Sequence, residues 1–404
     1  MTHLSGLSTR QGTRTVSSST FISSLQRLVF LAAALMSAPS LAAGQLVIKL
    51  ENKTSHSAPL PIIISVTMSN IGDGPLFLYR KETPFGTNDS HLASDQFRVR
   101  DSQGALAHFI GQRSYWGAPR FSHFMLLQPG QSVQKDIDLT SEYDFGNGGA
   151  FALKFVMNLG HEPSPEESTA EELAAFVASK QAEVESNEIV VIVDHPIADL
   201  GSRSNGAICT GPQNDAIESA KRLAHRRAFE AIQVLWKVYS RPLGEIAYSY
   251  HRKQRYVRWF GEVGPEEPVK GEAGWEGSLN HEAVGAVDAV YMRSADLPSN
   301  QLSPTCGCPG EPPETKAKVE DRNPYHAQFC DSYFALPEDG VWTTRTSVMA
   351  HELSHFYDRY QSGRSDYVYS KPLAEQLARD DRWKAVRNAD NVEFFITDTT
   401  PYED

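Results

Sequence analysis

The chain has no surplus of positive charge, and this absence limits the partners that it can have. Its 404 residues include 38 Lys and Arg against 50 Asp and Glu, which gives a net charge of −12 at pH 7. Nucleic-acid binding depends on a basic surface that neutralises phosphates, so the composition argues against nucleic acid as a partner. With 40% hydrophobic and 22% charged residues, the chain is typical of a globular protein, and its length suits two or three domains.

The sequence beyond its first forty residues also lacks an apolar run long enough to cross a bilayer. The early apolar run, Leu28 to Ala38, follows Arg27 and is itself too short to span a membrane. Small residues follow it, which suits signal-peptidase cleavage after Ala42 or Ala43. The sequence therefore predicts a signal peptide over residues 1–43, secretion either directly or through a periplasm, and no membrane contact after cleavage.

Cysteine is scarce and confined to the C-terminal half, where it occurs at Cys209, Cys306, Cys308 and Cys330. The chain has no pair of C-x-x-C knuckles, which excludes a zinc ribbon. Cys306 and Cys308 are too close in sequence to bond to each other without strain, so we expect Cys209 to pair with one of them and Cys330 with the other. Two disulfides agree with export, because disulfides persist outside the reducing cytosol.

The N-terminal half has the pattern of a β-sheet domain. From Gln45 to about Leu159, short runs of alternating apolar residues are separated by turn residues such as Pro129-Gly130. Several short strands at this spacing predict an antiparallel β-sandwich. Its histidines lie in unrelated contexts and predict no catalytic site.

A helix and a linker are predicted to follow this domain. Ser168 and Glu171 form a capping box for a helix over about 168–184, and the apolar run 188–193 predicts a last strand. A segment with Pro, Gly and Ser comes next and is typical of a linker. The predicted boundaries are therefore 44–194 for the sandwich domain, 195–208 for the linker and 209–404 for a second domain.

The second domain is predicted to be mostly helical with a small sheet. Apolar residues repeat at helical spacing over Asp215 to Tyr239, which predicts a long amphipathic helix with one buried face. The fold class expected for the whole chain is therefore α+β and multidomain, with the sandwich first and the helical domain second.

Two histidines with a glutamate between them, His351-Glu352-Leu353-Ser354-His355, form the main chemical motif of this domain. Residues i and i+4 share one face of a helix, so both imidazoles can reach one zinc ion at about 2.0–2.1 Å. Glu352 lies beside that face, where it can take a proton from a zinc-bound water and pass it to a leaving amine. No Pro or Gly interrupts Thr343 to Gln361, which favours one continuous helix.

A catalytic zinc needs a third protein ligand, and the known classes differ in where it comes from. The metzincin pattern has Gly and His at the places that Asp358 and Gln361 occupy here, so that class is excluded. Asp358 would have to reach back past the second histidine and strain the helix. Glu375 and Glu393 lie at a distance that glutamate-ligand zinc proteases allow, although neither has the usual Asn-Glu context.

Asp366 is the candidate that the local sequence favours. It follows Ser362-Gly363, a pair that can end the helix and turn the chain back. A short loop could then present the carboxylate of Asp366 to the open side of the ion. The sequence thus predicts a zinc site made of His351, His355 and Asp366.

These residues resemble the deuterolysin, or aspzincin, metalloendopeptidases, whose third zinc ligand is an aspartate. Their second motif reads Gly-Thr, then Asp, then Tyr-Gly; this chain keeps the Gly, Asp and Tyr but has Arg364 for Thr and Ser370 for the last Gly. The segment Ala385 to Phe395 is similar to one in the peptidyl-Lys metalloendopeptidase branch. The resemblance covers about Cys209 to Phe395, and the N-terminal half is more weakly similar to the pro-domains of bacterial members.

The resemblance implies a role for several further residues. Tyr369 would donate a hydrogen bond to the oxyanion, and Asp390 and Glu393 would receive a lysine side chain on the primed side of the cleaved bond. The disulfides would join Cys209 to Cys306 and Cys308 to Cys330. The sandwich would be a pro-domain, partnered with the catalytic domain of the same chain.

The sequence therefore predicts a secreted zinc metalloendopeptidase, made as a proenzyme, that acts on protein or peptide substrates with one Zn²⁺ in its catalytic domain and a preference for Lys. Two alternatives stay open. One is a secreted zinc exopeptidase, and the other is a non-catalytic adhesive or inhibitory protein on the same scaffold. The presence of a suitable residue at every catalytic position argues against the non-catalytic alternative.

Overall fold

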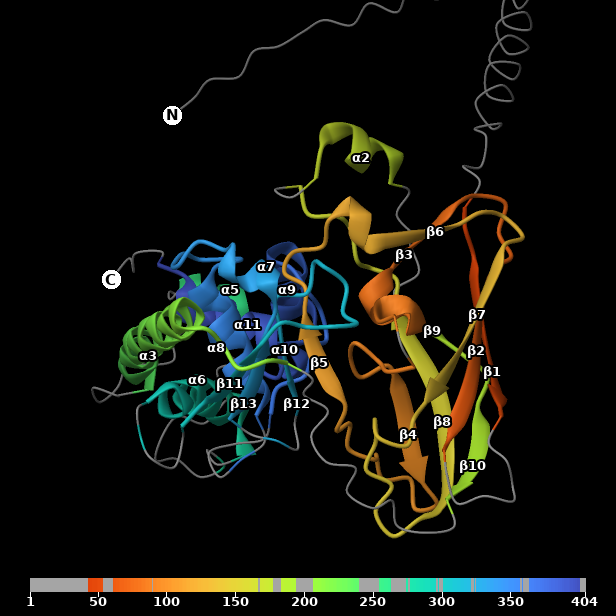
Figure 1. Ribbon diagram of the computed structural model, residues 1–404, viewed down its shortest axis with the longest axis horizontal. Coiled ribbons are helices and arrows are strands. Elements are labelled where there is room, and N and C mark those ends of the chain that lie inside the picture. Colours follow the sequence, from red (N-terminus) through yellow and green to blue (C-terminus); the bar gives the residue numbers. More distant parts are fainter. Residues whose placement is uncertain are drawn as a thin grey trace, which may run out of the picture. The chain divides into compact units, whose positions relative to one another are not determined.

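A computed structural model gives the structure of the chain (Figure 1). It describes residues 43–53, 61–88, 90–165, 168–176, 183–193, 206–239, 254–262, 274, 277–295, 297, 301–320, 323, 325–356, 358 and 363–399, with the side chains of 174, 175 and 236–239 left out. The predicted signal peptide, apart from residue 43, and most of the predicted linker lie outside the described residues. No helix in the described part of the chain is long and apolar enough to cross a membrane.

The N-terminal half consists of antiparallel strands that share one hydrophobic core. Apolar and polar residues alternate along β1, so that Leu46, Ile48 and Leu50 are buried and the residues between them are exposed. Side chains from all the larger sheets meet in this core. One sheet has the order β1-β2-β7, a second has the order β10-β8-β4 with β9 on the edge of β8, and β3 pairs with β6. The strands are β1 (Leu46–Asn52), β2 (Ile63–Asn70), β3 (Leu76–Tyr79), β4 (Phe97–Asp101), β6 (Phe124–Leu127), β7 (Ser132–Asp138), β8 (Gly149–Asn158), β9 (Glu183–Glu185) and β10 (Ile189–Val193).

The helix expected over about 168–184 is much shorter in the structure. The helix α2 (Ala170–Ala175) is capped by Thr169, which forms the capping box with Glu172, one residue later than predicted. It ends where Phe176 turns to pack against Phe77 and Phe124. Residues 183–185 then form strand β9 on β8, because this places Val184 against the sheet core. Tertiary packing has overridden the local helical pattern.

Three short 3₁₀ turns connect the N-terminal strands: η1 (Arg80–Glu82), η2 (Pro84–Gly86) and η3 (Phe121–His123). The first two follow β3 directly, and η3 leads into β6. Thr83 caps η2 by accepting a hydrogen bond from the Phe85 amide. These turns are important for the site because they carry buried side chains out of the N-terminal core.

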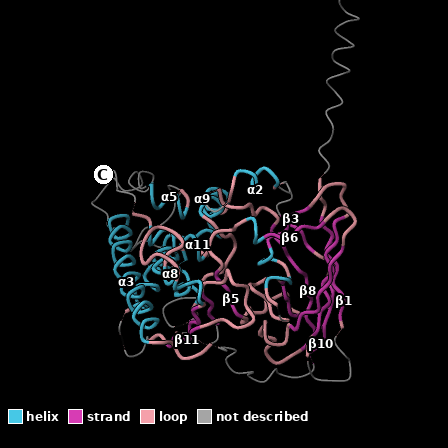
Figure 2. The backbone as a smooth tube through the Cα atoms, turned by 45° about the horizontal axis from the view of Figure 1, so that its top comes forward, coloured by secondary structure: helices cyan, strands magenta, loops and turns pink. Residues whose placement is uncertain are grey.

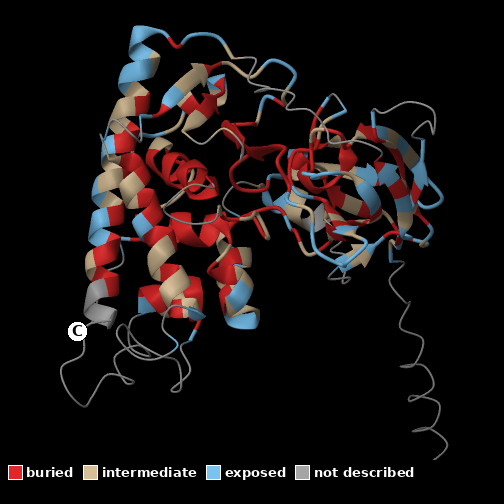
Figure 3. Cartoon of the chain, turned by 90° about the horizontal axis from the view of Figure 1, so that it is seen from below, coloured by how far each residue is buried: buried red, intermediate tan, exposed pale blue. Residues whose placement is uncertain are grey.

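The C-terminal half is helical around a second hydrophobic core. The long helix α3 has one buried and one exposed face, as the sequence predicts (Figure 3). Its small residues, among them Ala220, Ala224 and Ala228, let the neighbouring helices approach closely. The helices are α3 (Gly211–Tyr239), α5 (Gln254–Phe260), α6 (Leu279–Ser294), α7 (Asp331–Phe334), α8 (Arg345–His355), α9 (Lys371–Asp380), α10 (Arg382–Ala385) and α11 (Ala389–Thr397).

A four-stranded sheet joins the two halves of the chain. Its order is β11-β13-β12-β5, with β11 parallel to β13 and the other pairs antiparallel. Three of its strands come from the C-terminal half: β11 (Ser303–Cys306), β12 (Ala317–Glu320) and β13 (His326–Phe329). The fourth, β5 (Gln112–Tyr115), comes from the N-terminal half and lies beside β12 at the edge of the sheet (Figures 1 and 2).

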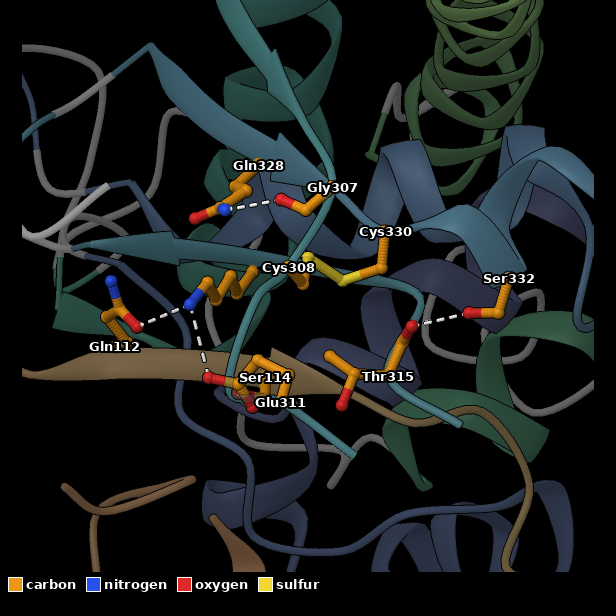
Figure 4. The surroundings of a disulfide bond; sticks show 10 residues. Gln112, Ser114, Gly307, Cys308, Glu311, Thr315, Gln328, Cys330 and Ser332 are labelled. Carbon is orange, nitrogen blue, oxygen red and sulfur yellow. Dashed lines mark hydrogen bonds and ion pairs between the residues drawn. A yellow bond between two sulfur atoms is a disulfide. The ribbon is translucent and has the colours of Figure 1, made fainter. Parts of the chain in front are cut away.

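The two disulfides pair as the family resemblance implies. Cys209 is bonded to Cys306 and Cys308 to Cys330, each with a Cα–Cα distance of 5.0 Å. The first ties the chain just before α3 to strand β11, and the second ties the loop after β11 to the end of β13 (Figure 4). Both bridges therefore stiffen the small sheet.

Candidate active site

Helix α8 carries the two histidines and is buried along nearly all of its length. It starts with a capping box in which Ser347 donates its amide to Thr344 Oγ1 at 3.1 Å and Thr344 donates its amide to Ser347 Oγ at 3.0 Å. Every residue from Thr346 to His355 is buried. A helix fixed on all sides holds its side chains in defined rotamers, which a metal site requires.

The helix ends at His355, earlier than the uninterrupted sequence to Gln361 suggests. The guanidinium of Arg293 donates to the carbonyls of Leu353 and Ser354, at 2.8 and 3.3 Å, and so satisfies groups that would otherwise accept from a further turn. The chain then returns at Gly363, where a Cβ atom would lie only 1.9 Å from the carbonyl oxygen of His355. Glycine is the residue that this close approach allows.

Because the chain turns back at Gly363, Asp366 lies close to the two histidines. The Nε2 atoms of His351 and His355 are 3.0 Å apart, and Asp366 Oδ1 lies 3.3 Å from the first and 3.4 Å from the second. Ligands at about 2.0–2.1 Å from a tetrahedral zinc ion are separated by roughly 3.3 Å, so the three atoms fit such an ion. Within the described residues, neither oxygen of Asp366, whose side chain is only 1% exposed, has a hydrogen-bond partner, as expected for a carboxylate that binds a metal.

The other ring nitrogen of each histidine is held by the protein. His355 Nδ1 lies 2.7 Å from the carbonyl oxygen of Arg364, and His351 Nδ1 lies 3.2 Å from Glu393 Oε2 and 3.1 Å from Asp390 Oδ1. If Nδ1 carries the proton, Nε2 offers its lone pair to the metal, which is the usual arrangement in zinc sites. Asp390 and Glu393, expected from the resemblance to bind a substrate lysine, thus also contact His351.

Asp358 and Glu375 have other partners, whereas Glu393 lies at His351 Nδ1 and forms, with His351 and Asp390, a second group that could hold a metal ion. Asp358 forms a bidentate pair with Arg293 at 2.9 and 3.1 Å and accepts a hydrogen bond from Tyr325. Glu375 lies 3.9 Å from Arg258 on the surface. These contacts agree with the choice of Asp366.

Glu352 is placed for acid–base chemistry. Its side chain is buried, and in the part of the chain that the structure describes neither of its oxygens has a hydrogen-bond partner. Burial raises the pKa of Glu352 to about 8. A carboxyl group with a pKa near neutrality can both accept and return a proton at physiological pH.

Tyr369 is buried between the two halves of the chain. It forms a small aromatic cluster with Tyr79 and Trp116 of the N-terminal half. Its hydroxyl has no hydrogen-bond partner within the described ranges. Burial raises its pKa well above 10, so the phenol stays protonated and can donate.

Two residues at the site were not identified from the sequence. Lys81 of η1 places Nζ 3.9 Å from Asp366 Oδ2 and 3.5 Å from the centre of the Tyr369 ring. The ring of Tyr115, on β5, lies 4.4 Å from that of His351. Both come from the N-terminal half, more than 200 residues before the motif, and no local pattern marks them.

A cavity lies beside the loop that carries Asp366, whereas the side chains of His351, His355 and Asp366 are buried. This cavity of about 320 Å³ is lined by residues of both halves and reaches Asp366. It has room for roughly ten water molecules. Acidic groups line it, among them Glu82 and Asp95.

A helix with two histidines and a buried glutamate, completed by an aspartate from the following loop, defines a zinc-dependent peptidase. Comparison with known proteins gives the same answer. The aspzincin family model, described as lysine-specific metallo-endopeptidase, matches residues 246–397. A peptidyl-Lys metalloendopeptidase of Pleurotus ostreatus is 30% identical over 142 residues, which cover 35% of this chain and 71% of the relative. The chain belongs to the aspzincin family and is a zinc metalloendopeptidase.

Longer relatives match more of the chain. A peptidyl-Lys metalloendopeptidase of Grifola frondosa is 26% identical over 383 residues, covering 93% of this chain and 97% of the relative. An extracellular protease of Aeromonas hydrophila is 25% identical over 351 residues, covering 83% and 88%. Among solved structures, a zinc peptidase from Grifola frondosa matches with a TM-score of 0.37 and 23% identity, over 47% of this chain and 96% of that one.

Proposed function

We propose that this protein is exported as a proenzyme and hydrolyses peptide bonds with Glu352 as general base, preferring substrates with Lys on the primed side. One zinc ion would be held by His351, His355 and Asp366. The observation that carries the proposal is the set of three donor atoms, 3.0–3.4 Å apart, beside a buried glutamate that lacks a hydrogen-bond partner in the described structure.

Different residues of the chain have different roles in the proposed reaction. Zinc, when bound, supplies Lewis-acid activation of water and of the scissile carbonyl. Glu352 removes a proton from the attacking water and returns it to the leaving nitrogen. Tyr369, a neutral donor, hydrogen-bonds the oxygen on which negative charge develops.

The preference for Lys is supported by two buried carboxylates. Asp390 and Glu393 lie side by side on α11, and each has an oxygen directed away from His351. Glu393 Oε1 accepts a hydrogen bond from the Tyr115 hydroxyl at 3.3 Å, and Asp390 Oδ2 accepts the Ser370 amide at 2.8 Å. If Tyr115 leaves, Glu393 regains an acceptor that a substrate ammonium could use.

The proposal also includes secretion of the protein and the boundary between its pro-domain and its catalytic domain. The apolar run near residue 30, the two disulfides and the extracellular relative support secretion. The separate cores of the N-terminal and C-terminal halves support a sandwich pro-domain at 44–194 and a catalytic domain at 209–404, with the boundary between them.

The test is a Glu352→Gln variant, with Glu375→Gln as the matched control on the surface. After release of the N-terminal half, both proteins are loaded with zinc and incubated with a mixed peptide library, with and without chelator, and cuts are mapped by mass spectrometry. We expect Glu352→Gln to keep its zinc and lose about 10²–10⁴-fold in rate, whereas the control cuts as the wild type does. Full activity of Glu352→Gln would refute the mechanism, and cuts only at peptide ends would indicate an exopeptidase.

A further inference from the structure

The loop between α8 and α9 carries Asp366, and it lies against the start of α11. Two backbone hydrogen bonds join these segments. The Ser365 amide donates to the carbonyl oxygen of Arg387 at 2.9 Å, and the Ala389 amide donates to the carbonyl oxygen of Ser365 at 2.9 Å. Ser365 and Asn388 thereby form an isolated parallel bridge. The residue just before Asp366 is therefore fixed to the chain at the start of α11.

The side chain of Asn388 holds the two residues just after Asp366. Asn388 is fully buried. Its Oδ1 accepts the backbone amides of Tyr367 at 2.7 Å and Val368 at 3.2 Å. Its Nδ2 donates to the carbonyl oxygen of Val368 at 3.3 Å and to Asn391 Oδ1 at 2.8 Å. A side-chain amide can accept two hydrogen bonds and donate two, so Asn388 uses its full capacity, and three of its four bonds go to the loop.

A second buried asparagine fixes the orientation of the first. Asn391 lies on α11 and accepts from Asn388 through Oδ1. Its Nδ2 donates to the carbonyl oxygen of Trp259 on α5 at 2.6 Å and to that of Ala374 on α9 at 2.9 Å. With its amide nitrogen held by two other helices, Asn391 must present its oxygen to Asn388. The side chain that holds the loop is therefore itself locked in one orientation.

An ordinary structural role for Asn388 would be to cap α11, because asparagine is a preferred residue at the position just before a helix. Asn388 does occupy that position, but in the described structure its side chain makes no capping hydrogen bond to α11. Its oxygen is used for the loop amides instead. The side chain thus serves the loop that carries Asp366 and not the helix that it precedes.

The start of α11 contacts both sides of the predicted metal site. Through Asp390 and Glu393 it contacts Nδ1 of His351, and through Asn388 it holds the residues that follow Asp366. The Nε2 atom of His351 and Oδ1 of Asp366 are 3.3 Å apart. Ligands must be held within about 0.5 Å of the productive geometry. Any movement of the loop relative to α11 therefore changes the fit of the three donor atoms.

We propose that Asn388 is a positioning residue for the metal site, which acts through the backbone of Tyr367 and Val368 to hold the carboxylate of Asp366 against the two histidines. This inference rests on the metal site of the proposed function and adds to it a residue outside the ligand motif. Without Asn388, two amides and a carbonyl of the loop lose their partner in a buried place, and the loop must shift or admit water to satisfy them.

The test measures the zinc affinity of the full chain by equilibrium dialysis against zinc that is buffered with a chelator. Conditions are chosen at which every variant is folded, so that the measured affinity does not depend on the free energy of unfolding. Urea denaturation of the metal-free proteins gives that free energy separately. A role in the fold alone lowers stability and leaves zinc affinity unchanged, whereas a positioning role lowers zinc affinity.

We expect Asn388→Leu to bind zinc at least tenfold more weakly than the wild type, as for other residues that orient a metal ligand without touching the metal. The matched control is Asn280→Leu. Asn280 is also a fully buried asparagine of the C-terminal half, but it accepts from Tyr256 on α5 and Arg382 on α10. Its replacement should lower stability and leave zinc affinity within twofold of the wild type.

Two outcomes would overturn the inference. One is wild-type zinc affinity in Asn388→Leu, and the other is an equal loss of affinity in Asn280→Leu. If Asn388→Leu does not fold, Asn388→Ser, which leaves room for a water at the loop amides, takes its place and should bind zinc at least threefold more weakly; wild-type affinity in that variant would likewise overturn the inference.

Asp366→Ala, measured in parallel, separates this inference from the proposed function. If Asp366→Ala binds zinc as the wild type does, the proposed metal site is wrong and the inference fails with it. If Asp366→Ala loses zinc while the Asn388 variants keep their affinity, the metal site stands and only the role of Asn388 is refuted.

Discussion

The backbone amide of Ser370 donates to Asp390 Oδ2 at 2.8 Å while Ser370 itself has a φ of +97° and a ψ of 150°. This region of backbone space is almost restricted to glycine. Ser370 stands where the family motif has glycine, so the departure seen in the sequence is a position of strain in the structure.

A Ser370→Gly variant should therefore be more stable than the wild type, by about 1 kcal/mol in free energy of unfolding. Urea denaturation of the zinc-loaded protein measures it. Ser370→Ala, which keeps a Cβ at the same backbone angles, is the control and should show no such gain. A gain in both variants would mean that the serine hydroxyl, and not the backbone, is the source of the strain.

Arg293 should be critical for stability because it serves both the end of α8 and Asp358. Replacing it by Met removes the bidentate cation from the Asp358 side chain, which is only 7% exposed, and removes donors from two carbonyls, which we expect to cost about 3–5 kcal/mol. Chemical denaturation measures the loss. A second change, Asp358→Leu, should restore part of it, since the unpaired charge is then gone. Additive losses in the double variant would contradict this explanation.

Zinc content should depend on Asp366. Asp366→Ala removes one of three donors, so we expect the metal bound after dialysis to fall to near zero, measured by atomic absorption. The surface variant Asp381→Ala should keep its metal. If folded Asp366→Ala keeps the normal zinc content and turnover, Asp366 is not a zinc ligand and the proposed site is wrong.

The position of the cut that releases the catalytic half can be predicted from the absence of lysine. No lysine occurs between Lys180 and Lys221. A Lys-selective enzyme should therefore cut itself before Lys180 or depend on another protease, for example near Arg203. N-terminal sequencing of purified, self-processed protein gives the answer. A start between residues 195 and 208 would be incompatible with strict selectivity.

Acid should weaken the fold through His123. Burial, reinforced by the charges of Arg120, Lys316 and Arg80, lowers the pKa of His123 to about 3. In the unfolded chain its pKa is about 6.5, so between these values the unfolded state binds the extra proton and stability falls as the pH is lowered. From pH 7 to pH 5 this amounts to up to about 2 kcal/mol. Denaturation curves at both values should show a smaller loss for His123→Gln, and an equal loss would contradict the assignment.

The proximity of His351, His355 and Asp366 could be predicted from the sequence because these residues lie within sixteen positions of each other. Helical spacing places His351 and His355 on one face, and Gly363 marks the turn that returns Asp366. The end of α8 could not be predicted, since it depends on Arg293 from a helix some sixty residues earlier.

The N-terminal residues that lie at the site are not marked by any local pattern in the sequence. Tyr115 lies 278 residues before Glu393, and β5 reads as one more strand of the N-terminal sheets. The helix expected to reach residue 184 likewise ends at Ala175. Phe176 packs against other aromatic rings instead, and residues 183–185 pair with β8 as a strand. Such competition between local pattern and distant contacts is decided only by the whole fold.

Both sulfur bridges lie between residues 209 and 330, and the N-terminal half has no cysteine. If the connecting segment is cut, no covalent bond holds the two halves together, so whether they stay associated depends only on non-covalent contacts such as the pairing of β5 with β12.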